Sequence, residues 1–228
     1  MVYRPRVGKT QVHGIRDVQR LWMILSPHGG GLHRRIVIGR KRLPETGSHE
    51  RHWAFVDRVA RDPVALTDDL RETEYATRTR GIRHQAAARA AAEGVYAIAE
   101  HDDHAHLAYR LELPEEPGDA QRELGIHREA SYIAAVFNPY KPWRQPLPYP
   151  TELQAKFGDR RFVALEPAFL DFAGTELVLI GATDDISAEL GITLDVDREV
   201  ADTFDLFREL AHDGGEHPMR PLFEGLWS

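Results

Sequence analysis

Hydrophobic and polar positions alternate most clearly in two paired segments of the chain. Residues 21–25 and 33–39 are β-type runs joined by a linker with three consecutive glycines, which supply the positive φ angles that a reversal of direction needs. Residues 94–100 and 105–113 flank the short polar segment 101–104 in the same way. Both patterns predict antiparallel β-hairpins.

The return strand of the second hairpin has the sharpest alternation. One face carries apolar residues, and the other carries polar residues, two of them histidines. Such a period of two is typical of a strand with one buried face. The apolar positions are Ala105, Leu107, Tyr109, Leu111 and Leu113, and the polar positions are His104, His106, Arg110 and Glu112.

Capping residues, glycine stops and apolar spacing indicate helices elsewhere. Ser48 begins one candidate and Asp62-Pro63 follows its end, while Gly125 and Gly158 end two others. The expected helices cover residues 48–61, 85–93, 119–126, 151–158 and 198–211, and further strands are expected at 131–137, 161–165 and 176–180.

Together these elements predict a single α+β domain over residues 1–228. We expect mainly antiparallel sheet built from hairpins, with four or five helices packed on it. A doubly wound parallel sheet is disfavoured because turns, not helices, join the clear strand pairs. The proline-rich loop 138–150 is the only candidate internal boundary.

Composition narrows the function classes. The 228 residues include no cysteine, which excludes disulfides, thiol catalysis and cysteine-ligated metal sites. Apolar runs are too short to span a bilayer, and the first residues do not resemble a signal peptide. A cytoplasmic location without a membrane partner is therefore expected.

The charge is unevenly divided along the chain. Residues 1–100 hold 18 Lys and Arg against 11 Asp and Glu, whereas residues 101–228 hold 11 against 25. A basic surface of this kind is a candidate nucleic-acid interface, although the same cations can instead pair with the acidic half of the fold or of a second subunit. The cations concerned are Arg34, Arg35, Arg40, Lys41 and Arg42.

The tip of the second hairpin is a candidate metal site. If Asp102-Asp103 forms a two-residue turn, His101 pairs with His104 and His106 lies on the same sheet face. Three imidazoles suit a divalent transition metal ion, with Asp103 or Asp102 as an oxygen ligand. The alternative is a solvated hairpin tip without a metal.

The loop 138–150 presents aromatic residues among five prolines. Tyr140, Trp143 and Tyr149 on a stiff, extended segment are candidate partner-binding residues, and the alternative is that they pack on their own core. The apolar tail 221–227 is a candidate for docking, either within the chain or in self-association.

No intact catalytic motif accompanies these features. His49-Glu-Arg-His52 is one residue shorter than the metalloprotease signature, and neither a phosphate-binding loop nor a nucleophile elbow occurs. We therefore favour a non-catalytic binding or regulatory protein that acts through protein–protein contacts or self-association. The alternatives are a metal-dependent hydrolase or oxidase that uses the histidines at 101–106, and nucleic-acid binding through the basic N-terminal half.

Overall fold

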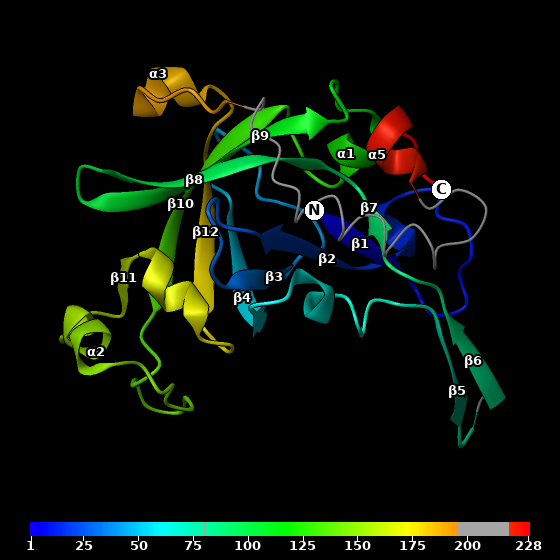
Figure 1. Cartoon of the computed structure of the whole chain (residues 1–228), viewed down its shortest axis with the longest axis horizontal. Coiled ribbons are helices and arrows are strands. Elements are labelled where there is room, and N and C mark those ends of the chain that lie inside the picture. The colour runs from blue at the N-terminus through cyan, green and yellow to red at the C-terminus, as the bar shows by residue number, and fades with distance from the viewer. Residues whose placement is uncertain (80, 196–218) are drawn as a thin grey trace.

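A computed structural model describes residues 1–79, 81–195 and 219–228 (Figure 1). Its strands are β1 Val2–Pro5, β2 Val18–Leu25, β3 His33–Ile38, β4 Arg51–Ala60, β5 Thr73–Thr77, β6 Gly81–Gln85, β7 Arg89–Ala90, β8 Glu93–His101, β9 His104–Leu113, β10 Glu129–Phe137, β11 Phe162–Ala164 and β12 Glu176–Thr183. The α-helices in these ranges are α1 Asp119–Glu123, α2 Thr151–Phe157, α3 Ile186–Leu190 and α5 Arg220–Glu224, and the 3-10 helices are η1 Ile15–Asp17, η2 Pro63–Leu66 and η3 Pro167–Asp171.

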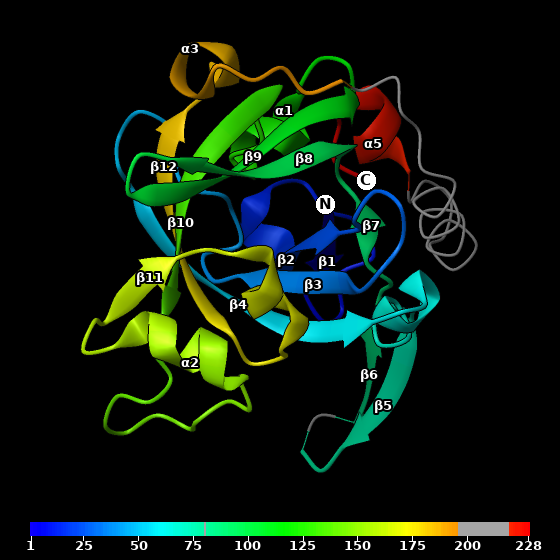
Figure 2. The same cartoon turned by 60° about the vertical axis from the view of Figure 1, so that its left-hand side comes forward.

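One large antiparallel sheet organises the fold. Its strand order is β7-β1-β2-β3-β4-β12-β10-β9-β8. The strand β11 pairs with residues 135–137 at the end of β10, beyond the part that pairs with β9. The strand β12 therefore lies between β4 and β10 and joins the early strands to the later ones. A separate two-stranded sheet, β5-β6, projects from the body (Figures 1 and 2).

The sheet curls around a single main core. In Figure 2, β1–β3 lie across from β8–β10. Apolar side chains from both layers join one buried cluster, in which Leu21 and Ile36 belong to the early strands and Leu107 and Tyr132 to the later ones. The alternation predicted for 105–113 holds from Ala105 to Leu111, because these apolar positions lie in this cluster. Leu113 packs instead on a second, smaller cluster, and His106 on the polar face is also buried.

Both predicted hairpins are confirmed, as β2–β3 and β8–β9. Strands at 131–137, 161–165 and 176–180 are confirmed as β10, β11 and β12. Two expected helices are confirmed as α1 and α2, and each is followed by a glycine with positive φ, Gly125 at 68° and Gly158 at 48°.

The expected packing of four or five helices on the sheet is wrong. The described residues are mostly antiparallel sheet, with four short α-helices of which only α2 reaches seven residues. The helix expected at 198–211 lies outside the described residues. No helix among the described residues is long and apolar enough to cross a membrane.

The helix expected at 48–61 is instead the strand β4. Residues His52, Ala54 and Val56 point inward and alternate with the outward Trp53 and Phe55. The apolar spacing fits a helix equally well, but hydrogen bonding to β3 on one side and β12 on the other favours the strand.

The alanine-rich segment 85–93, also expected to be helical, is extended and includes β7. Ala86 to Ala92 are all buried, because small side chains let this segment pack closely against neighbouring backbone. Burial in tertiary contacts has overridden the helical propensity of alanine.

Candidate metal centre

The β8–β9 hairpin brings three histidines together. His101, the last residue of β8, pairs with His104, the first residue of β9, across the two-residue turn Asp102-Asp103. Asp102 takes a left-handed conformation, with φ of 54°, which aspartate tolerates better than most residues. Side chains two apart on a strand share a face, so His106 lies beside the pair.

The three rings are in mutual contact. Each histidine offers one ring nitrogen, and these nitrogens all lie within 4.8 Å of one another. The ring centroids of His101 and His104 are 5.5 Å apart, and those of His104 and His106 are 4.9 Å apart. We call His101, His104 and His106 the three-histidine site.

One ring nitrogen of His104 and one of His106 each have a hydrogen-bond partner, whereas two buried ring nitrogens of the site have none. Nδ1 of His106 lies 3.2 Å from the hydroxyl of Ser131 on β10, and Nδ1 of His104 lies 3.1 Å from the Asp103 carboxylate. Nε2 of His106 and Nδ1 of His101 are buried, and neither has a hydrogen-bond partner. An unsatisfied buried polar atom costs about 1–3 kcal/mol, so two in one cluster call for an explanation.

The surroundings of His106 favour its neutral imidazole, the form that binds metal. Burial lowers the pKa of His106, and the neighbouring His104 lowers it further, while Glu189 on α3 opposes the change. The hydrogen bond with His104 lowers the pKa of Asp103 below its ordinary value.

Asp103, expected as a ligand, lies outside the group of three close donors. Its side chain is 99% exposed and contacts the ring of His104. A carboxylate bonded to the second nitrogen of a histidine orients that ring and raises its basicity, so this placement suits support of a ligand rather than coordination.

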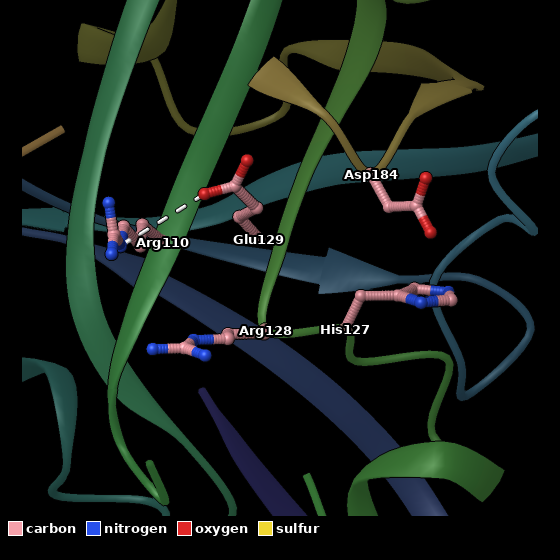
Figure 3. Close-up of a pocket in the computed structure, with 5 residues that line it drawn as sticks. All are labelled: Arg110, His127, Arg128, Glu129 and Asp184. Atoms are coloured by element: carbon pink, nitrogen blue, oxygen red, sulfur yellow. Dashed lines mark ion pairs between the residues drawn. The ribbon is translucent and has the colours of Figure 1, made fainter. Parts of the chain in front are cut away.

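An open polar pocket of about 530 Å³ lies farther along the same sheet (Figure 3). Arg110 is on the same face of β9 as His106, ~13 Å away at about 3.3 Å per residue. Its guanidinium lies 4.0 Å from Glu129 of β10, which also accepts a hydrogen bond from the Ile186 amide at the start of α3. The other lining residues are His127, Arg128 and Asp184. Nothing in the sequence indicates this pocket, although the alternation along β9 correctly predicts that Arg110 stands on the polar face of the strand.

The five cations of the expected nucleic-acid face have partners within the chain. Arg35 is buried and binds two carboxylates, Arg34 pairs with Asp171, and the Lys41 ammonium donates to the Val18 carbonyl. Arg42 and Arg40 lie 2.7 and 3.6 Å from Glu50. Of these partners only Asp171 belongs to the acidic half 101–228, because Glu50, Asp57 and Asp69 lie in the basic half. The expected pairing of the two halves is therefore seen for Arg34 alone among the five cations.

The aromatic residues of loop 138–150 divide into two groups. Tyr149 is 3% exposed, and its ring stacks on Phe157 inside the core. Tyr140 is partly exposed, while Trp143 is fully exposed. A partner therefore has access to Trp143 and Tyr140 but not to Tyr149.

The C-terminal tail docks on its own chain through at least two residues. Leu222 is buried, and the Trp227 ring contacts the edge of Tyr3 with centroids 5.4 Å apart. Self-association through the remaining tail surface, where Phe223 is 62% exposed, stays a prediction.

Comparison with protein-family models, curated proteins and solved structures finds no match for this chain.

Proposed function

We propose that this protein binds one divalent transition metal ion through His101, His104 and His106 and uses it as a metal-dependent enzyme. The close approach of three imidazoles, two of them with buried nitrogens that lack hydrogen-bond partners, is the observation that carries the proposal. A bound ion would satisfy both nitrogens at once.

The donor spacing suits the ion after small side-chain movements. Zinc–nitrogen bonds of about 2.0–2.1 Å in tetrahedral geometry place donor atoms ~3.4 Å apart. The present limit of 4.8 Å requires the rings to approach by ~1.4 Å or less. His104 can rotate because it stands at the hairpin tip with its side chain 30% exposed, whereas His106 is held by Ser131.

The ligand set favours a catalytic role over a structural one. Imidazole suits zinc, copper and nickel, and a structural zinc site has four protein ligands, whereas three leave a position for water. A metal ion in such a site lowers the pKa of bound water to near neutrality and so supplies a nucleophile. The protein contributes the ring orientation set by Ser131 and Asp103.

Two roles favoured or considered from the sequence receive less support. A binding protein that acts through the aromatic loop loses one of its three residues to the core, since Tyr149 is buried. The basic N-terminal face is occupied by internal ion pairs. The three-histidine site is preferred because the fold brings all three histidines together.

Metal content of the untagged protein, purified without chelator, tests the proposal. We expect close to one transition metal ion per chain by mass spectrometry, and its loss in His104→Ala and His106→Ala. The matched control is His28→Ala, which changes an exposed histidine in the β2–β3 linker and should retain the metal.

Thermal denaturation provides a second measurement on the same variants. Zinc at 100 times its Kd should stabilise the folded protein by ~2.7 kcal/mol, which corresponds to a rise in Tm of about 5–10 °C at this chain length. A metal-free protein whose Tm does not respond to zinc, copper or nickel would refute the proposal.

A further inference from the structure

A second group of side chains, on the same face of the sheet as His106 but on other strands, gathers aromatic rings. Trp53 and Phe55 on β4 point outward and are 45% and 40% exposed. Pairing of β4 with β12 and of β12 with β10 sets Trp53 in line with Val178 and Ala135. The surface thus combines strands from distant parts of the chain.

Two phenylalanines extend this surface. Phe137 at the end of β10 pairs with Phe162 at the start of β11, and their ring centroids are 5.4 Å apart. Trp53 contacts both rings, at 5.7 Å from Phe137 and 6.1 Å from Phe162. Trp53, Phe137 and Phe162 form one cluster, in which Phe137 is 6% exposed and lies beneath its neighbours, while Phe55 stands two residues along β4 from Trp53 on the same side.

Arginine side chains lie on these rings. The guanidinium carbon of Arg144 is 4.7 Å from the centroid of Phe137, and that of Arg161 is 5.5 Å from Phe137 and 5.6 Å from Phe162. Both residues are exposed. A guanidinium held flat on a ring keeps its N–H edges available for anionic oxygens. We call Trp53, Phe55, Phe137, Phe162, Arg144 and Arg161 the aromatic–arginine face.

Charge around the face opposes the charge of the whole chain. The whole protein carries a net charge of −7. At this face, Arg144 and Arg161 are joined by a third cation, the exposed Arg51, which is the outward residue of β4 next to Trp53. Glu176 is the acidic residue paired with this set, at 2.8 Å from Arg144. The local excess of positive charge therefore selects for an anionic ligand.

The adjoining loop presents one more aromatic side chain. Trp143, next to Arg144 in the chain, is fully exposed and has a φ of 70°, a conformation that costs free energy in a non-glycine residue.

We propose that the aromatic–arginine face binds single-stranded nucleic acid. Flat rings accept bases by stacking, and guanidiniums accept phosphates, which is the combination found in proteins that bind single strands. Trp53 and Phe55 are two residues apart on one strand, ~6.7 Å, which suits successive unstacked bases. An acidic polypeptide would satisfy the arginines but would leave the rings without planar partners.

Binding of fluorescein-labelled oligo(dT) to the full chain, in EDTA and at low salt, tests this inference. EDTA makes the result independent of the metal centre, so failure here leaves the metal proposal untouched. We expect saturable binding with quenching of tryptophan fluorescence, and a loss of affinity of about tenfold or more in Trp53→Ala/Phe55→Ala, because each stacked base contributes several-fold to a hundredfold.

The contribution of the arginines can be measured separately through the salt dependence of binding. Arg161→Ala should reduce the dependence of log affinity on log salt concentration by about 0.7, the value for one phosphate contact with a single strand. Tyr75→Ala and Arg78→Ala are matched controls, since Tyr75 is 45% exposed on β5 and Arg78 is exposed just after that strand, in the two-stranded sheet that projects from the body (Figure 1). Both variants should bind as the unmodified protein does.

Three results would overturn the inference. They are no binding at low salt, equal binding by the Trp53→Ala/Phe55→Ala variant whose melting curve shows it folded, and equal or tighter binding of poly-glutamate. The last result would identify the face as a site for acidic polypeptides.

Discussion

Replacement of Arg35 should destabilise the protein more than replacement of any exposed arginine. The Arg35 side chain is 2% exposed and binds Asp57 through Nε and Nη2, at 3.0 and 2.8 Å, and Asp69 through Nη1 and Nη2, at 2.6 and 3.0 Å. Nη1 also donates to the Leu66 carbonyl, and the guanidinium lies 5.5 Å from the Trp22 ring. Arg35 therefore ties β3 to β4 and to the segment after η2.

Arg35→Met keeps most of the side-chain volume but removes the cation of Asp57 and leaves Asp69 with Arg58 at 3.5 Å. Breaking a buried pair by removing one partner costs about 3–5 kcal/mol. We expect the lower part of this range because the Asp69 side chain is 47% exposed and can be rehydrated. At this chain length a loss of ~3 kcal/mol lowers Tm by about 6–12 °C.

Thermal and urea denaturation of Arg35→Met and Arg40→Met would measure the difference. Arg40 is the matched control, since it lies 3.6 Å from Glu50 and its side chain is 68% exposed. Its loss should change the free energy of unfolding by about 0.5 kcal/mol or less. A loss below about 1 kcal/mol for Arg35→Met would refute the view that Arg35 is a structural residue and reopen its assignment to a nucleic-acid face.

Two further predictions concern pH and the aromatic loop. The hydrogen bond from the Glu45 amide, opposed by partial burial and aided by His52, lowers the pKa of Glu50 from 4.5 to about 2. Ionised Glu50 therefore stabilises the folded protein fully above pH 4.5, and this contribution is lost as the pH falls toward 2. Glu50→Gln should flatten the dependence of the free energy of unfolding on pH in this window. Tyr149→Phe removes the buried 2.7 Å hydrogen bond to the Thr175 hydroxyl and should lower the free energy of unfolding, measured in urea, by about 1 kcal/mol. Tyr140→Phe, at the exposed end of the loop, should have a smaller effect. Equal effects of the two substitutions would contradict the placement of Tyr149 in the core.

Local sequence predicted the candidate metal centre because a two-residue turn fixes the register of its hairpin. His101, His104 and His106 lie within six residues, so no distant contact is needed to bring them together. The hydrogen bond between Ser131 and His106 could not be predicted from the hairpin, because the two residues meet only after β10 pairs with β9. The pocket beside Arg110 depends on the same pairing.

Elements that depend on distant partners were predicted least well. The apolar spacing of residues 51–60 is compatible with both helix and strand, and hydrogen bonds to β3 and β12 decide between them. The aromatic–arginine face follows from that decision, because Trp53 meets Phe137 and Phe162 only when β12 lies between β4 and β10. Arg35 was placed on a surface because the sequence gives no sign that Asp57 and Asp69 surround it.

The position of β12 has a consequence for how the chain acquires its fold during synthesis. The hairpins β2–β3 and β8–β9 form from neighbouring segments, but β4 ends at residue 60 and its partner β12 begins at residue 176. Until β12 has left the ribosome, β4 and β10 each present an unpaired edge, and such edges template aggregation. Closing so long a loop is slow compared with hairpin formation. A nascent chain therefore holds two partly formed half-sheets until β12, the last strand of the described residues, joins them. Protection by chaperones is most needed in that interval.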